Sequence, residues 1–239
     1  MRKSTLNARL QSAADLVRQG ALFADIGTDH AYLPLFLLDE GRITRAVCSD
    51  VNEGPLASAG RNAEERGHTD SVDLVLTDGA RGLEGRGITD YAICGMGGEL
   101  IADIISASPH LRDPDLNLIL QPMSKQASLR KFLLSEGFRI LSERYSHDAG
   151  KYYVCMQVRY HGIPQPINDE DAEIGLREFS DSDRDAHVGY LLSRLPTLAK
   201  AARGKELTGR PPIERVTVAM IRDLLAEQGV AVDINDYLF

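Results

Sequence analysis

Tryptophan is absent from the 239-residue sequence, cysteine occurs only three times, and basic residues are not in excess. Cys48, Cys94 and Cys155 form no Cys-x-x-Cys pair, so neither a disulfide framework nor a structural zinc site is expected. Each cysteine lies in an apolar run, which predicts a reduced thiol buried in the core. The formal net charge of −8 excludes a uniformly basic nucleic-acid-binding protein, although a local basic patch remains compatible with it.

Long hydrophobic runs are also missing. No apolar run approaches the roughly 18 residues that a helix needs to span a bilayer. The first residues, MRKSTLNARLQ, lack the apolar core and the small-residue cleavage site of a secretory signal peptide. A cytoplasmic protein without a membrane partner is therefore expected. The sequence does not fix the oligomeric state, and a monomer is the working expectation.

Apolar runs alternate with helical segments over the first part of the chain. The expected strands are 21–27, 45–50, 72–78, 90–95 and 117–122. The expected helices begin with one capped by Ser4 and ended by Gly20, and continue with 32–40, 55–66, 98–108 and 124–136. The strands are almost wholly apolar, as in a sheet that is covered on both faces. The pattern predicts a doubly wound α/β fold with a mostly parallel sheet.

The segment from 138 to 160 departs from this alternation. Two apolar runs, 138–145 and 152–160, are joined only by the turn 146–151, and a connection this short cannot make a parallel crossover. The pair must therefore form an antiparallel hairpin. Five parallel strands followed by such a hairpin resemble the seven-stranded, Rossmann-like sheet of class I AdoMet-dependent methyltransferases.

The first domain is expected to span residues 1–162, because a Pro-containing, acidic segment follows Tyr160. Residues 163–239 predict a small helical C-terminal domain, in which apolar residues recur at helical spacing and Pro196 interrupts the first helix. Between Arg194 and Arg215 basic residues outnumber acids, which locally reverses the charge of the chain.

Three of the expected strands end on acids. In an open parallel sheet, ligands bind beyond the carboxyl ends of the strands, near the point where the strand order reverses. Acids at these ends suit AdoMet, whose ribose diol, adenine amine and ammonium all donate to carboxylates, better than they suit a pyrophosphate. The segment after the first strand also has one glycine where the GxGxxG dinucleotide fingerprint has three. AdoMet is therefore favoured over NAD.

The residues at these strand ends form the expected cofactor site. They are Asp25, Gly27, His30, Asp50, Val51, Asp78, Gly79, Gly95, Met96, Gly97 and Gly98. Taken singly, each allows a structural interpretation: Gly27 a tight turn, Asp50 a helix N-cap, Asp78 with Gly79 a turn. Their occurrence at successive strand ends favours the cofactor site.

Several segments resemble the bacterial TrmK family of tRNA (adenine-N1)-methyltransferases, which modify adenine 22. They are LNARLQ at 6–11, ADIGTDHAYLP at 24–34, Asp78-Gly79, CGMGG at 94–98 and LILQP at 118–122. The resemblance covers about residues 4–160. It implies a methyltransferase domain with AdoMet as cofactor, a catalytic acid at Asp29, and a helical C-terminal domain that helps to hold tRNA.

Adenine N1 carries a lone pair that can attack the methyl sulfonium directly, so no metal or covalent nucleophile is needed. The protein must position the base in line and stabilise the positive charge that develops on it. Asp29 is the expected catalytic residue, because a carboxylate there can accept from the exocyclic amine and take the proton lost after transfer. The alternative is that Asp29 caps the helix that begins near Ala31.

Substrate contacts are expected from an aromatic residue, a strand end and basic side chains. Tyr32 can stack on an extruded adenine or pack within its helix, and His30 can orient the cofactor or make a structural hydrogen bond. The expected substrate-binding residues are Arg9, Tyr32, Gln121, Pro122, Lys125, Arg130, Lys200 and Arg203. Further basic candidates are Arg2, Lys3, Arg18, Lys131, Lys205 and Arg210, any of which can also be ordinary solvated surface.

Three rival functions remain at this point. The first is a methyltransferase of the same fold that acts on a small molecule or a protein, which the acidic net charge would suit. The second is a non-catalytic module that binds AdoMet or RNA. The third, an NAD-linked oxidoreductase, is disfavoured by the missing glycines.

Overall fold

Seven strands form one mixed sheet in the order β3-β2-β1-β4-β5-β7-β6. The computed structural model describes residues 5–177 and 181–233. The strands are β1 (Ala21–Ile26), β2 (Ile43–Asp50), β3 (Val72–Leu76), β4 (Asp90–Gly97), β5 (Asn117–Ser124), β6 (Phe138–Asp148) and β7 (Lys151–Tyr160). The first five strands are parallel to one another, and β7 is antiparallel to both β5 and β6. The expected sheet is therefore confirmed.

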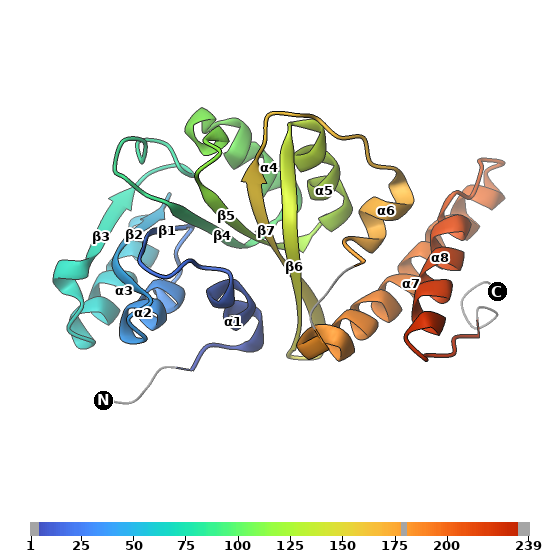
Figure 1. Cartoon of the computed structure of the whole chain (residues 1–239), viewed down its shortest axis with the longest axis horizontal. Helices are drawn as coiled ribbons and strands as arrows, with labels where there is room; N and C mark the ends of the chain where they lie inside the picture. Colours follow the sequence, from blue (N-terminus) through green and yellow to red (C-terminus); the bar gives the residue numbers. More distant parts are fainter. Residues whose placement is uncertain (1–4, 178–180, 234–239) are drawn as a thin grey trace.

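Helices cover both faces of the sheet (Figure 1). They are α1 (Ala8–Asp15), α2 (Tyr32–Asp39), α3 (Glu53–Glu65), α4 (Gly98–Ser106), α5 (Gln126–Ser135), α6 (Asp169–Ile174), α7 (Arg184–Leu207) and α8 (Glu214–Glu227). Phe23, Ala92 and Ile119 belong to one apolar cluster with residues of α1, α2 and α3. Ile93 and Leu118, their neighbours along the strands, belong to a second cluster with α4, α5 and the C-terminal helices. Successive strand residues thus serve opposite faces, which explains why the strand sequences are almost continuously apolar.

The first helix begins later than the sequence suggests. Ser4 lies outside the described residues, and Asn7 caps α1, its side-chain oxygen accepting from the Leu10 N–H at 2.9 Å. The helix ends at Asp15, so Gly20 does not end it but starts the approach to β1 with φ +77°. The cap predicted at Ser4 is therefore replaced by Asn7, since an asparagine is as good an N-cap as a serine.

The β6–β7 hairpin is tighter and longer than expected. Asp148 pairs with Lys151, so the turn consists of Ala149 and Gly150, both with positive φ. The six-residue turn predicted at 146–151 is wrong, because its outer residues continue the ladder. Since β5 pairs with β7 only at 156–158, the hairpin tip projects past the carboxyl end of β5. The hairpin tip therefore lies at the same end of the sheet as the acids that follow the parallel strands.

Helix α7 continues through Pro196, which was expected to interrupt it. Proline removes one backbone hydrogen bond and crowds the preceding turn. Leu191, Leu195 and Leu198 are buried on either side of it in the same apolar cluster as the sheet, so tertiary packing holds the helix together. The division at residue 162 stays a prediction, since the C-terminal helices share this cluster with the sheet. No helix in the described ranges is long and apolar enough to cross a membrane.

Candidate active site

A cavity of about 360 Å³ lies at the carboxyl ends of β1 and β4, beside the N-terminal end of α1. These two strands are neighbours in the sheet, and the chain leaves them in opposite directions along it, so they mark the point where the strand order reverses. The cavity is lined by Asn7, Arg9, Leu10, Asp25, Gly27, Asp29, Tyr32, Leu33, Cys94, Gly95 and Met96. Most of these lining residues were predicted to bind cofactor or substrate. They come from segments that are far apart in the chain, and the fold brings them together.

Asp25 forms the floor of this cavity. Only 8% of the residue is exposed, and the Thr28 hydroxyl donates to its carboxylate at 2.6 Å. Burial raises the pKa of the Asp25 carboxyl to about 6, and the nearby Asp50 carboxylate adds to the increase while the Thr28 hydrogen bond opposes it. A buried acid of this kind is poised to accept a cationic group.

Gly27 makes the turn directly after β1. Its φ of +71° favours glycine, and a Cβ there would lie 2.0 Å from Cε of Met96. The turn interpretation and the cofactor interpretation of Gly27 therefore coincide, because the tight turn keeps the wall of the cavity free of a side chain.

Asp29 and Tyr32 lie at the cavity rim on a left-handed loop. His30 and Ala31 have φ values of +62° and +53°, which is costly for residues with side chains and is found mostly at functional sites. The Asp29 side chain is 79% exposed, with Oδ1 3.3 Å from Nε2 of His30. The His30 and Tyr32 rings stack with their centroids 5.2 Å apart. Helix α2 has Ala31 as its N-cap and no side-chain capping bond, so the interpretation of Asp29 as a cap is wrong.

A residue that sequence reasoning missed supports this loop. Asn62, on α3, donates from its side-chain amide to the backbone oxygen of His30 at 2.8 Å. No local pattern marks Asn62, since it lies on a different helix from the loop that it holds. Asn7 and Cys94 also line the cavity without having been predicted.

Asp50, Val51 and Asp78 lie at the neighbouring strand ends, outside the cavity lining. Asp50 Oδ1 accepts from the Asn52 N–H at 2.7 Å, and Asn52, not Asp50, is the N-cap of α3. Val51 is 64% exposed. Asp78 is exposed and pairs with Arg81 at 3.2 Å. These residues offer an apolar side chain and carboxylates on the open edge next to the cavity, as an adenosine would require.

The GMGG segment brings the end of β4 close to the turn between β5 and α5. Gly95 has φ +79°, and its N–H donates to Oε1 of Gln121 at 3.1 Å. A Cβ on Gly98 would lie 2.6 Å from the backbone oxygen of Lys125. Gly98 therefore serves close backbone approach, while Gly95 shapes the cavity; a Cβ on Gly97 would meet only the Ser124 side chain, at 3.4 Å. Gly79, with φ +63°, lies against Ile104.

Gln121 and Pro122 are buried, so the prediction that they contact the substrate directly is wrong. Gln121 Oε1 also accepts from Nη1 of Arg9 at 2.6 Å. It therefore holds Arg9 at the cavity wall and shapes the Gly95 turn. Arg9 itself is half-buried and lines the cavity, so it remains accessible from there.

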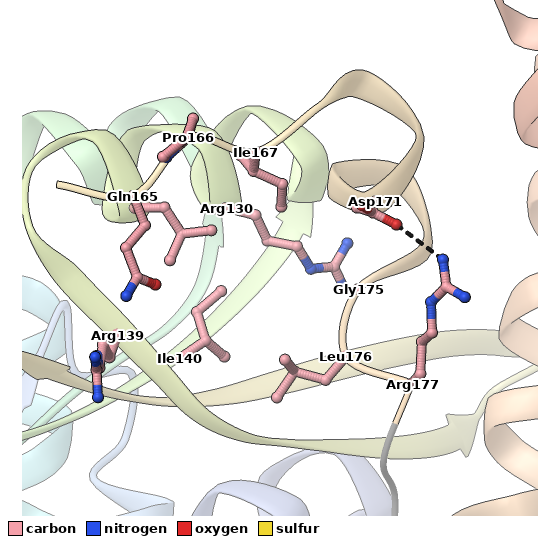
Figure 2. Close-up of a pocket in the computed structure, with 11 residues that line it drawn as sticks. Arg130, Arg139, Ile140, Gln165, Pro166, Ile167, Asp171, Gly175, Leu176 and Arg177 are labelled. Carbon is pink, nitrogen blue, oxygen red and sulfur yellow. Dashed lines mark hydrogen bonds and ion pairs between the residues drawn. The ribbon is translucent and has the colours of Figure 1, made fainter.

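Arg130 does not face the solvent, and its predicted contact with the substrate is wrong. It is 0% exposed, Nε donates to Oε1 of Glu143 at 2.7 Å, and Nη1 donates to the backbone oxygen of Ala172 at 2.8 Å. Figure 2 shows its guanidinium turned toward Gly175, beside a cavity of about 560 Å³ whose rim carries the Asp171–Arg177 ion pair. The partners lie far away in the sequence, so this burial could not be predicted from the helix alone.

The other basic candidates differ in their surroundings. Arg18 pairs with Asp90 at 2.9 Å, Lys131 pairs with Asp169, and Lys205 pairs with Glu214 at 2.6 Å. Lys125 is exposed, with Nζ 3.6 Å from Oε1 of Glu99. Lys200, Arg203 and Arg210 are exposed but do not line the 360 Å³ cavity. Arg2 and Lys3 lie outside the described residues.

The three cysteines are free, and their predicted burial is confirmed for Cys48 and Cys155 but wrong for Cys94. Cys48 and Cys155 are buried, whereas Cys94 is half-buried and lines the cavity, where burial raises its pKa well above the ordinary value. In the part of the chain that the structure describes, no group of three or more His, Cys, Asp or Glu side chains is arranged to hold a metal ion.

Comparisons with known proteins agree with this arrangement. A family model described as a methyltransferase domain matches residues 6–156. The tRNA (adenine(22)-N(1))-methyltransferase of Bacillus subtilis is 33% identical over 153 residues, which cover 64% of this chain and 64% of that relative, slightly less than two thirds of its length. A crystal structure of Streptococcus pneumoniae Sp1610, described as a candidate tRNA (m1A22) methyltransferase, is 30% identical with a TM-score of 0.79 and covers 92% of this chain and 100% of that chain. The same protein in complex with S-adenosyl-L-methionine has a TM-score of 0.77, at 30% identity, and covers 91% of this chain and 98% of that chain.

The sheet order and the strand-end site define a class I methyltransferase domain. Within that class, the chain belongs to the TrmK family, in agreement with the resemblance of its motifs.

Proposed function

We propose that this protein transfers a methyl group from AdoMet to N1 of an adenine in tRNA, position 22 by family membership. The observation that carries the proposal is the cavity between β1 and β4, which brings a buried acid, Asp25, and an exposed acid, Asp29, together with the exposed ring of Tyr32. One acid is suited to the cofactor and the other to the base. A small molecule or a protein as substrate is the alternative.

The residues present fit AdoMet. Asp25 suits its ammonium, Asp50 its ribose diol, and Val51 with Asp78 its adenine, while Gly27 and Gly95 keep the cavity wall free of side chains. His30, Gly79, Met96, Gly97 and Gly98 complete the proposed cofactor site from the strand ends. AdoMet bound there supplies an electrophilic methyl group on a sulfonium.

Asp29 is the proposed catalytic residue. Its carboxylate accepts a hydrogen bond from the exocyclic amine of the adenine, which aims N1 into the cavity. It then stabilises the positive charge that appears on the base and takes the proton that the base loses. Tyr32, stacked on His30 and 51% exposed, offers its free face to the base. Arg9 lies at the same rim and suits a phosphate.

Other parts of the proposal follow from the substrate. tRNA is the proposed partner, and the cytoplasm, where tRNA is found, is the proposed place of action. We infer a monomer with a methyltransferase domain at 1–162 and a helical domain at 163–239. On this domain, the exposed Lys200 and Arg203 on α7 are further candidates for phosphate contacts.

The test is methyl transfer from labelled AdoMet to unmodified bacterial tRNA, followed by digestion to nucleosides and mass analysis. We expect 1-methyladenosine, and we expect none with a tRNA whose adenine 22 is replaced by guanine. If the protein binds AdoMet but methylates no tRNA, the substrate assignment is wrong and the small-molecule or protein alternative takes its place. If the guanine variant is methylated equally well, the protein methylates adenine in tRNA but its target is not adenine 22.

A further inference from the structure

A second cavity, of about 720 Å³, lies next to the first. It is formed by the turn between β5 and α5, the tip of the β6–β7 hairpin, and one side of α6 and α7. The two cavities meet through the end of β4: Met96 lines the first, and a Cβ on Gly97 would lie 3.4 Å from Oγ of Ser124, which lines the second. The second cavity therefore lies beside the end of the strand that lines the first.

The wall of this second cavity combines aromatic rings with positive charges. Tyr152, Tyr153 and Tyr190 supply the rings, and Lys125, Lys151 and Arg194 supply the charges. The one carboxylate in the wall, Glu173, is paired with Arg194 at 2.6 Å. Lys151 is exposed at the hairpin tip, directly after the Ala149–Gly150 turn. The local charge is thus positive in a protein whose net charge is −8.

Tyr152 is held in place from two sides. A Cβ on Gly189 of α7 would lie 2.1 Å from the Tyr152 ring, so only glycine allows the helix to approach this closely. On the hairpin itself, the His147 and Tyr152 ring centroids are 4.6 Å apart. The Tyr152 ring is therefore fixed by packing and does not have to be ordered when a ligand binds, which lowers the cost of binding.

Two polar groups in this wall lack partners. The Tyr190 hydroxyl and Nε of Arg194 are buried and have no hydrogen-bond partner among the described residues. Leaving such groups unpaired is costly, and buried polar groups in proteins are nearly always satisfied. A polar ligand or ordered water in the adjoining cavity would remove this cost.

We propose that this second cavity binds a neighbouring nucleotide of the substrate tRNA, with its base against Tyr153 and its phosphate at Lys151 and Lys125. This inference rests on the proposed function. Flat aromatic rings beside cations are the combination that holds unpaired nucleotides, because rings stack on bases and cations neutralise phosphates. The site also has a physical purpose, since exposing the adenine breaks stacking, and a second nucleotide bound nearby offsets that cost.

The experiment compares the full-length wild-type protein with Lys151→Ala, Tyr153→Leu and Tyr153→Phe. Arg139→Ala is the matched control, because Arg139 is exposed and lies at the opposite end of β6 from the hairpin tip. The measurements are the Kd for unmodified tRNA at several salt concentrations, the Kd for S-adenosylhomocysteine, and methyl transfer.

We expect Lys151→Ala to weaken tRNA binding and to reduce the slope of log Kd against log salt by about 0.7–0.9, the contribution of one phosphate contact. Tyr153→Leu is expected to weaken tRNA binding by about tenfold, within the range for loss of one base stack, whereas Tyr153→Phe retains it. The control and the affinity for S-adenosylhomocysteine stay unchanged in every variant.

The outcomes separate the two proposals. If the wild-type protein methylates tRNA but Lys151→Ala and Tyr153→Leu behave like Arg139→Ala, the second nucleotide site is wrong while the proposed function stands. If only Lys151→Ala weakens binding, the assignment of a base to this cavity is overturned. If the wild-type protein methylates no tRNA, both proposals fail together.

Discussion

Asp25 and Asp29 have opposite surroundings although they are four positions apart and line the same cavity. Asp25 is 8% exposed and hydrogen-bonded to Thr28, whereas the Asp29 side chain is 79% exposed. Desolvation disfavours the charged form of the Asp25 carboxylate, whereas the Asp29 carboxylate stays in contact with solvent. Substitutions of Asp25 and of Asp29 are therefore expected to have different effects on the protein.

Replacing Asp29 with Asn should abolish most of the turnover without affecting the cofactor. The amide cannot take the proton of the methylated base and provides no negative charge, so we expect kcat for tRNA methylation to fall by about 10²–10⁴-fold. The Kd for AdoMet, measured by calorimetry, should stay within about a factor of two of the wild type, because the proposed role places the exposed Asp29 side chain against the base and not against the cofactor. Asp78→Asn is the control and should weaken AdoMet binding. An Asp29→Asn enzyme with normal kcat would exclude this role.

The pKa of Asp25, about 6, predicts a pH-dependent affinity for AdoMet. Only the ionised carboxylate attracts the ammonium, so the Kd for AdoMet should rise by up to about tenfold for each pH unit below 6 and level off above it. Asp25→Asn should bind AdoMet weakly and without this dependence.

The raised pKa of Asp25 also makes the free energy of unfolding depend on pH. This dependence has the opposite direction to that of the affinity for AdoMet. The folded-state pKa of Asp25 is raised above its unfolded value of about 3.8, so the folded state binds more protons between pH 4 and 6. The contribution of Asp25 to the free energy of unfolding therefore falls as the pH rises through this window in the cofactor-free protein. Urea unfolding of the wild type and Asp25→Asn at pH 4.5 and 7.5 measures it, and an equal difference at both values would contradict the assignment.

At the scale of elements, the site depends on how closely α4 approaches the turn between β5 and α5. Gly98 is the first residue of α4, and the backbone oxygens of Ser124 and Lys125 lie 2.9 and 2.6 Å from the position of its missing Cβ. Backbone atoms cannot rotate away as a side chain would. A side chain at position 98 would therefore push α4 away from the turn between β5 and α5. The spacing of these two elements, and with it the walls of both cavities, depends on glycine at this position.

Gly98→Ala should destabilise the fold by about 1–3 kcal/mol, the usual cost of overpacking, and should weaken AdoMet binding. Gly204→Ala is the matched control, because Gly204 lies inside α7 with nothing within 4 Å of its missing Cβ, and it should stabilise the protein by roughly 0.5–1 kcal/mol. Chemical denaturation measures both. Equal stability of the two variants would show that the element spacing can relax.

For the molecule as a whole, a buried ionic cluster fastens the C-terminal helices to the sheet. Glu143 of β6 accepts from Arg130, from the Tyr145 hydroxyl at 2.7 Å and from the Leu176 N–H at 2.9 Å. Arg130 in turn donates to the backbone oxygen of Ala172. In Figure 1, α6, α7 and α8 lie beside the β6 edge of the sheet. The cluster therefore joins the sheet, which carries the first cavity, to the C-terminal helices, which complete the wall of the second cavity.

Arg130→Met should destabilise the protein by about 3–5 kcal/mol, because it leaves the Glu143 carboxylate buried without its cation. The double variant Arg130→Met with Glu143→Leu should recover a large part of this loss, since no unpaired charge remains. A double-mutant cycle by urea unfolding measures the coupling. If the double variant is as unstable as the sum of the single variants, the pair is not coupled.

Patterns along the chain predicted the strands well because a strand covered on both faces is apolar along its length, and the acids of the site follow those strands directly. The motifs from Asp25 to Asp29 and from Gly95 to Gly98 could be read in the same way. Arg130 and Gln121 could not, because each is buried by partners that lie in other elements. Pro196 was misjudged for a related reason, since packing of α7 on the sheet outweighs the lost hydrogen bond.

The sequence by itself determined the succession of strands and helices along the chain and the antiparallel hairpin that follows the parallel strands. It also determined the positions of the acids and glycines at the strand ends. These depend on local propensity and on the alternation of apolar and polar residues. Only the tertiary structure decided which charges are buried, that Asn62 holds the loop at His30, and that the hairpin tip and α7 form a second cavity beside the first. Burial and pairing are properties of segments far apart in the chain, and they exist only once the whole core is packed.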